Sequence, residues 1–156
     1  MPLVEEMDLA TVERLILEAV AELLTQDRHL LECDANERSI THKFAEHLQR
    51  RFPDWHVDCE YNRDGHDVKR LTLAGRFNVK SDDVSATTVY PDIIIHSRGT
   101  CENLAVIEVK KSTNPEGMDR DIDKLKRFKD QLGYGIALFF SFVTGTSEVS
   151  YEHQSF

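Results

Sequence analysis

The chain has 156 residues, a length that suits one domain and can bury an apolar core without disulfides. Its three cysteines, Cys33, Cys59 and Cys101, show no CxxC spacing, so we expect neither a disulfide framework nor a zinc site. The longest apolar run, Ile136 to Phe140, has five residues, far fewer than the roughly 20 of a membrane helix. The first residues also lack the basic start of a signal peptide. We therefore expect a reduced, cytoplasmic setting and no membrane partner.

The net charge of −9 is distributed unevenly along the chain. Residues 1–36 hold nine acidic and two basic side chains, for a net charge of −7. Residues 37–156 hold 19 acidic and 17 basic side chains, for a net charge of −2. Nucleic-acid binding depends largely on basic side chains that neutralise phosphates, so the overall charge argues against such a partner. The uneven distribution weakens that argument for residues 37–156.

An amphipathic helix is predicted over residues 8–25, with Asp8 as its N-cap. Its apolar side chains recur at spacings of three and four residues: Leu9, Val12, Leu15, Ile16, Ala19, Val20, Leu23 and Leu24. The opposite face is acidic. A packing helix with a solvated face explains this pattern, and the alternative is a helix that docks on a protein partner.

A polar loop is expected over residues 26–35, followed by a second helix over residues 37–51. Asp34 or Asn36 is placed to cap this helix. The helix should end before Pro53, because proline cannot continue a helix and restricts the residue before it.

Residues 55–62 alternate in the manner of a strand. The members expected on one side are Trp55, Val57, Cys59 and Tyr61. After this strand we expect a turn at residues 63–67, a short strand at 70–73 and an exposed loop at 78–88.

Two short β-branched runs, residues 90–95 and 104–110, have the composition of buried strands. The segment between them, residues 98–103, is short and rich in turn-forming residues. We therefore expect the two runs to pair as an antiparallel hairpin.

The remaining elements are predicted from similar patterns. A loop at residues 112–117 precedes a helix at 119–132, which Gly133 should end. Residues 134–143 form a nearly continuous apolar run, typical of a strand covered on both faces. Residues 147–153 are expected to add an edge strand. The element order predicts an α/β domain in which helices flank a mixed sheet.

Charged residues interrupt both strands of the predicted hairpin. Side chains alternate faces along a strand, so Val106, Glu108 and Lys110 should share one face. Antiparallel pairing would bring Asp92, at the start of the first run, beside the end of the second. Two carboxylates and an ammonium would then converge, which is costly unless they are paired or bind a metal. The simpler alternative is a salt bridge in which Lys110 only neutralises Glu108.

The Pro91-Asp92 pair followed by Glu108-x-Lys110 resembles the signature of the PD-(D/E)xK superfamily, the restriction-endonuclease-like nucleases. The likeness runs from Glu37 onward, through a helix, a strand, the Pro-Asp strand, the Glu-x-Lys strand, a helix and a further strand. The segments that are similar to a small stand-alone branch of the superfamily are residues 36–42, 60–63 and 109–112. The resemblance implies a single domain, residues 1–156. Within it, residues 36–156 would form a restriction-endonuclease-like core and residues 1–35 an N-terminal helical extension.

The activity implied by this resemblance is Mg²⁺- or Mn²⁺-dependent hydrolysis of phosphodiester bonds in DNA or RNA. Asp92, Glu108 and the backbone carbonyl of Val109 would bind the metal, which suits the preference of Mg²⁺ for oxygen ligands. Lys110 would position the attacking water or stabilise developing charge. Glu37 matches a helix glutamate that many family members add to the metal site, and its alternative role is to cap the helix or complement its dipole.

Three basic residues are candidate nucleic-acid contacts: Arg63, Lys111 and Lys124. Each has a plainer alternative, a structural role for Arg63, a surface lysine for Lys111 and a solvated helix face for Lys124. We expect DNA ahead of RNA as the partner, and relatives of this type often form homodimers.

The main alternative function is a catalytically inactive module that acts through protein or nucleic-acid partners, with the acidic N-terminal helix as a docking site. A third is a metal-dependent enzyme that acts on another phosphorylated substrate.

Overall fold

The computed structural model describes residues 7–61, 63–64, 67–68, 70–72, 86–88 and 90–156, with only the backbone described between residues 63 and 88. The helices are α1 (Leu9–Gln26), α2 (Arg28–Glu32), α3 (Glu37–Arg51) and α4 (Asp119–Leu132). The long strands are β1 (His56–Cys59), β6 (Ile93–His96), β7 (Asn103–Lys111), β8 (Ile136–Val143) and β9 (Ser150–Ser155). Four short strands are β2 (Arg63–Asp64), β3 (Asp67–Val68), β4 (Arg70–Thr72) and β5 (Ala86–Thr88).

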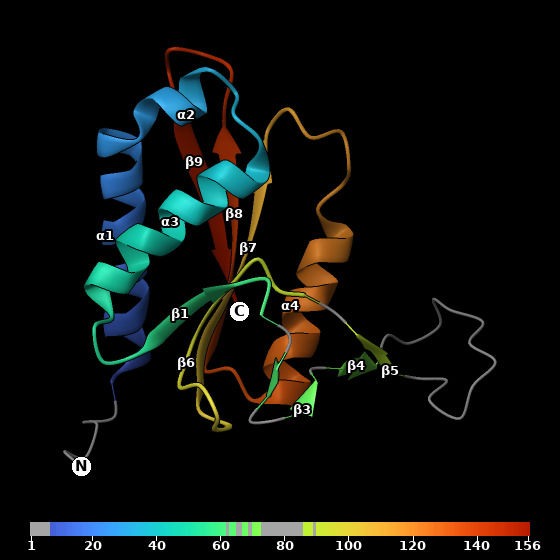
Figure 1. Ribbon diagram of the computed structural model, residues 1–156. Helices are drawn as coiled ribbons and strands as arrows, with labels where there is room; N and C mark the ends of the chain where they lie inside the picture. Colours follow the sequence, from blue (N-terminus) through green and yellow to red (C-terminus); the bar gives the residue numbers. More distant parts are fainter. Residues whose placement is uncertain (1–6, 62, 65–66, 69, 73–85, 89) are drawn as a thin grey trace.

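The long strands form one five-stranded sheet in the order β1-β6-β7-β8-β9. Neighbouring strands are antiparallel except β7 and β8, which are parallel and are joined across α4. A parallel pair needs such a crossover, because its two strands run in the same direction. Helices α1 and α3 lie on one face of the sheet and α4 lies on the other (Figure 1). The predicted α/β class, with a mixed sheet flanked by helices, is confirmed.

The predicted hairpin is the pair β6 and β7. Its antiparallel register places Ile93 opposite Ile107, Ile94 opposite Val106 and Ile95 opposite Ala105. All of these side chains are buried. Because β6 and β7 lie inside the sheet and are covered by helices on both sides, apolar residues suit nearly every position.

The two faces of the sheet contribute to two apolar clusters. The cluster under α1 and α3 contains, among others, Val12, Ile16, Phe44, Leu48, Ile93, Ile107 and Phe140. The cluster under α4 contains Ile94, Val106, Leu125, Phe128, Tyr134, Ala137 and Phe139. Alternation along β7 divides its side chains between the two clusters. Since α1 contributes fully buried residues, it is part of the same core as α3.

The predicted polar loop at residues 26–35 is wrong in part, because it contains the short helix α2. Leu31 in this helix is fully buried and packs into the cluster under α1 and α3, so the segment has an anchor that its polar composition hides. Of the two predicted caps for α3, Asn36 is the one used, and its side chain accepts a hydrogen bond from the Ser39 N–H.

The strand predicted over residues 55–62 is shorter than expected. Strand β1 ends at Cys59, and Glu60 has a positive φ of 50°. This left-handed residue breaks the two-residue alternation that a continuous strand would keep. Tyr61 therefore packs with the cluster under α4, whereas Trp55 and Val57 pack with the cluster under α1 and α3. The prediction that Tyr61 shares their side is wrong.

Between residues 63 and 88 the described backbone forms two strand pairs, β2 with β3 and β4 with β5. The short strand predicted at residues 70–73 corresponds to β4. The exposed loop predicted over residues 78–88 is wrong at its end, because Ala86–Thr88 is the paired strand β5. The centre of the predicted turn, residues 65–66, lies outside the described residues, as do residues 78–85.

The C-terminal half follows the predictions closely. Helix α4 has the predicted bounds, and Gly133 ends it with a φ of 69°. Glycine suits this position because other residues rarely adopt the left-handed conformation. Strand β9 begins at Ser150, three residues later than predicted. Of the helices in the described part of the chain, none has the length and apolar character needed to span a membrane.

Candidate active site

Asp92 and Glu108 meet at the end of the β6–β7 hairpin. The Asp92 N–H donates to Glu108 Oε1 at 3.4 Å, and Asp92 Oδ2 accepts from the Val109 N–H at 2.8 Å. The register explains this contact, because Asp92 precedes Ile93 and Glu108 follows its partner Ile107. The convergence of these carboxylates, expected from the sequence, is present in the structure.

The Glu108 carboxyl group is buried on the α4 face of β7. Its side chain is only 3% exposed. Burial raises the pKa of Glu108 well above its ordinary value, and the nearby charge of Asp92 raises it further, while Lys124 opposes both effects. A buried carboxylate in this position requires a cation to be stable in its charged form.

The cation beside Glu108 is Lys124 from α4. Its Nζ lies 2.7 Å from Glu108 Oε1 and donates to the carbonyl oxygen of Tyr90 at 3.0 Å. The sequence predicts Lys124 only as a candidate nucleic-acid contact or a solvated lysine, and its pairing with this carboxylate was not predicted.

Lys110 lies on the same face as Glu108, as predicted, but its ammonium group has other partners. Its Nζ lies 2.6 Å from Asp121 Oδ2 and donates to the carbonyl oxygens of Glu116 at 3.3 Å and Gly117 at 3.1 Å. Lys110 is therefore paired with α4 and the loop before it. The salt bridge to Glu108 that formed the plainer alternative is replaced by the one from Lys124.

Two ion pairs thus join β7 to α4. Glu108 and Lys110 are two residues apart on the strand, which puts them on one face. Asp121 and Lys124 are three residues apart on the helix, which also puts them on one face. Each element carries its acid before its base, and α4 runs in the opposite direction to β7, so Glu108 meets Lys124 and Lys110 meets Asp121. This complementary spacing is the feature of the sequence from which the pairing of Lys124 with Glu108 and of Asp121 with Lys110 could have been predicted.

Glu37 lies in the first turn of α3, and its Oε2 accepts a hydrogen bond from Asn114 Nδ2 at 2.7 Å. The side-chain cap of α3 comes from Asn36, so Glu37 does not supply it. Glu37 and Asp92 line one groove of about 330 Å³ on the α3 side of the sheet. The other residues that line this groove are Arg38, Thr41, His42, Cys59 and Glu60.

The charges around this groove favour a cation. Their effect is seen at the thiol of Cys59. Partial burial and the neighbouring carboxylates of Asp58, Asp92 and Glu60 raise the pKa of this thiol to about 11. A field that disfavours a thiolate also attracts positive charge. Arg38 offsets part of it through an ion pair of 3.4 Å with Glu60.

The remaining candidate contacts are placed differently. Lys111 points to the opposite side from Lys110, where its Nζ lies 3.1 Å from Asp34 Oδ1. The side chain of Arg63 lies outside the described residues. A role for Arg63, Lys111 or Lys124 in nucleic-acid binding stays a prediction.

Within the described ranges, the His, Cys, Asp and Glu side chains form no group of three or more that could hold a metal ion. A divalent ion at this hairpin would be bound by Asp92 and Glu108 together with backbone oxygens and water. This donor set is the kind that Mg²⁺ uses, since Mg²⁺ prefers oxygen ligands and keeps several waters.

Comparison with models of known families, with curated proteins and with solved structures yields no match for this chain.

Proposed function

We propose that the protein is a metal-dependent nuclease that hydrolyses phosphodiester bonds, with Asp92 and Glu108 as its metal ligands. The observation that carries this proposal is the approach of Asp92, just before β6, to Glu108 of β7: the Asp92 N–H donates to the buried Glu108 carboxylate, and the charge of Asp92 raises the pKa of Glu108. Such an arrangement is unfavourable unless a cation is present to balance it. A hard divalent cation would hold a phosphate oxygen and activate water there.

The order of the elements supports a restriction-endonuclease-like core. The resemblance implies a helix, three strands, a helix and a further strand. The corresponding elements of the five-stranded sheet and its flanking helices are α3, β1, β6, β7, α4 and β8. The glutamate expected on the first helix is Glu37, which lines the same groove as Asp92. We propose residues 36–156 as this core and Glu37 as an auxiliary ligand that acts through water.

The residues of this chain have distinct parts in the proposed reaction. The Val109 N–H fixes the orientation of the Asp92 carboxylate. Glu108 supplies the second carboxylate, and the groove beside Asp92 gives a phosphodiester access from the α3 side. We propose DNA ahead of RNA as the substrate, and a homodimer would let two such sites address two strands.

A cleavage assay tests the proposal directly. The purified chain is incubated with labelled single-stranded DNA, double-stranded DNA and RNA in Mg²⁺, Mn²⁺ or a chelator. We expect metal-dependent cleavage that falls at least about 100-fold in Asp92→Asn and Glu108→Gln, because both remove a negative metal ligand. Asp54→Asn is a matched control, since Asp54 also follows a proline but lies in an exposed turn after α3. Cleavage that persists in both site variants would refute the proposal.

One observation favours the alternative of a non-catalytic binding module. The pairs Lys124–Glu108 and Lys110–Asp121 balance the buried charges without any metal. Calorimetric titration with Mn²⁺ separates the two functions, because a pure binding module should release no heat that depends on Asp92.

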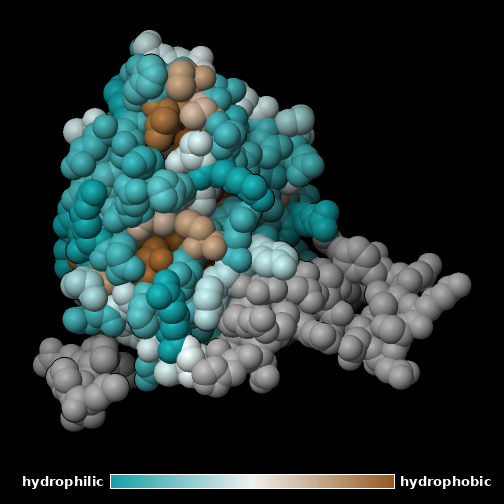
Figure 2. Space-filling model, in the orientation of Figure 1, coloured by the Kyte–Doolittle hydropathy of each residue, from teal (hydrophilic) through white to brown (hydrophobic). Residues whose placement is uncertain are grey.

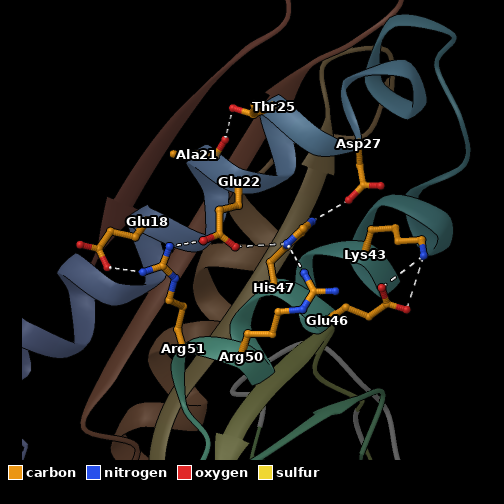
Figure 3. A network of polar contacts seen from close by, with 10 residues as sticks. All are labelled: Glu18, Ala21, Glu22, Thr25, Asp27, Lys43, Glu46, His47, Arg50 and Arg51. Atoms are coloured by element: carbon orange, nitrogen blue, oxygen red, sulfur yellow. Dashed lines mark hydrogen bonds and ion pairs between the residues drawn. The ribbon is translucent and has the colours of Figure 1, made fainter.

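Docking through α1 receives less support, since Arg51 of α3 already pairs with Glu18 and Glu22 on the acidic face of α1 (Figure 3). Figure 2 also shows that apolar atoms gather only in small patches on the face that carries α3.

A further inference from the structure

The Lys124 ammonium group occupies a position built from oxygen atoms. It lies between the carboxylate of Glu108, at 2.7 Å, and the backbone carbonyl of Tyr90, at 3.0 Å. Its side chain is 22% exposed and covers Glu108, which is nearly inaccessible to solvent. A carboxylate and a backbone carbonyl are also the ligand types that hard divalent cations prefer.

A divalent ion and an ammonium group cannot both occupy this position. They would compete for the same carboxylate oxygen, and two cations at contact distance repel each other strongly where water is excluded. A metal ion that binds Glu108 through Oε1 must therefore displace Lys124 from that oxygen. The side chain can leave, because it is long, unbranched and partly open to solvent.

Lys110 has the opposite character. It is 11% exposed and is held by one carboxylate and two backbone carbonyls, all contributed by α4 or by the loop before it. These contacts fix the start of α4 against β7. Because Asp121 and Lys124 share a helix face, this anchor also aims Lys124 at Glu108.

We propose that Lys124 is the internal cation of this site, which holds Glu108 when no metal is bound and is displaced when a divalent ion enters. Once displaced, its ammonium group is available to a phosphate oxygen at the same rim. Lys110 is then a positioning residue that acts through Asp121. The identity of the competing ligand as a divalent metal rests on the proposed function.

Calorimetric titration of the full chain with Mn²⁺ tests the displacement. Lys124→Met keeps the length of the side chain but removes its charge, and we expect it to bind Mn²⁺ at least about tenfold more tightly than the unaltered chain. Lys126→Met is the matched control: it removes the same charge from the same helix, but Lys126 is exposed and lies over the Phe156 ring. Its Mn²⁺ affinity should stay within about twofold of the unaltered chain, because exposed charges are screened.

The outcomes separate this proposal from the nuclease proposal. Tighter binding in Lys124→Met alone supports the internal cation, even if the unaltered chain cleaves nothing and the nuclease proposal fails. Equal or weaker binding in Lys124→Met overturns the internal cation, even if cleavage depends on Asp92 and the nuclease proposal stands. Absence of Mn²⁺ binding in both the unaltered chain and Lys124→Met overturns both.

The role of Lys110 is tested by removing its ion pair in two ways. Lys110→Met alone leaves the partly buried Asp121 without its partner, so we expect a lower melting temperature and weaker Mn²⁺ binding. The double variant Lys110→Met/Asp121→Leu replaces the pair with apolar side chains, an exchange that is often neutral. We expect it to recover both quantities. If Mn²⁺ binding stays weak after the melting temperature recovers, Lys110 acts on the site directly and the positioning role is wrong.

Discussion

The two faces of the central sheet differ in where their charged side chains lie. On the face under α1 and α3, the buried strand side chains are apolar. A network of ion pairs lies between the helices above them, and the partly exposed strand residues Lys111 and His153 pair with Asp34 and Glu13. Figure 3 shows this network, in which Arg51 contacts Glu18 and Glu22 while His47 contacts Asp27. On the face under α4, charged side chains arise from the strands themselves, as Glu108 and Lys110 do.

The difference indicates which charges are needed for structure. In the helix-to-helix network, the pair of Glu18 and Arg51 forms with little desolvation, because both side chains keep about one-third of their surface in solvent, whereas His47 is buried. Charges on buried strand positions lose their hydration, and apolar residues there would often be as stable. The buried charges of β7, Glu108 and Lys110, both lie on its α4 face, whereas Lys111 on the other face is only partly buried, and this is the reason to propose a metal site at Glu108.

The largest expected effect is the loss of a large apolar side chain from the α1 and α3 face. Phe140 is fully buried, and its ring lies 5.3 Å from that of Phe44. We expect Phe140→Ala to lower the free energy of unfolding by about 3–5 kcal/mol, because it leaves a cavity as well as losing contacts. Urea denaturation measures this. Phe156→Ala, at the partly exposed chain end, is the control and should cost clearly less.

A smaller effect is expected for a partly buried ion pair on the other face. Asp58, which pairs with Ile94 in register, accepts from His96 at 2.6 Å and from Arg98 at 2.9 Å. Burial alone would raise the pKa of Asp58, but the hydrogen bonds and charges of Arg98 and His96 outweigh it and lower the pKa below 3.8. We expect Asp58→Asn to cost about 2 kcal/mol at pH 7.

The pH dependence follows from the sign of this shift. A carboxylate with a lowered pKa stabilises the fold above its ordinary pKa and loses that contribution as the pH falls through the lowered value. The difference between the unaltered chain and Asp58→Asn should therefore be largest at neutral pH and shrink below pH 3.8. Urea denaturation at pH 7 and pH 3 tests this, and a constant difference would contradict the assigned role.

The smallest effect is expected at the helix-to-helix network. Glu18 lies 3.1 Å from Arg51, but both side chains are at least one-third exposed. We expect Glu18→Gln to change the free energy of unfolding by less than about 1 kcal/mol, as is usual for exposed pairs. A larger loss in urea denaturation would show that both faces depend on charge, and the contrast between them would not hold.

The elements that the sequence predicts well are those with local signals. Helix α4 has the predicted bounds because its apolar spacing and Gly133 are both local features. The contact between Asp92 and Glu108 was predictable because a short hairpin leaves little freedom in register. The two carboxylates of the candidate site could therefore be found without coordinates.

The parts that the sequence did not predict depend on tertiary packing or unusual backbone. Pairing of Lys124 with Glu108 requires the rotation of α4 about its axis and its height above β7, which no local pattern specifies. Tyr61 changes sides because Glu60 adopts a left-handed conformation, which is uncommon for a residue other than glycine, asparagine or aspartate. Leu31 was missed because it lies in a polar segment, where a short apolar anchor gives no helical periodicity that could be recognised.

The parallel pairing of β7 with β8 has a consequence for the order of events during folding. Asp92 and Glu108 are 16 residues apart and meet as soon as their hairpin closes, which takes microseconds in isolated hairpins. Lys124 reaches them only when α4 docks on β7, and its bond to the Tyr90 carbonyl spans 34 residues, a longer-range closure that is slower. The two acids thus come together before their counter-charge arrives, so this corner of the molecule should be among the last to reach its native arrangement.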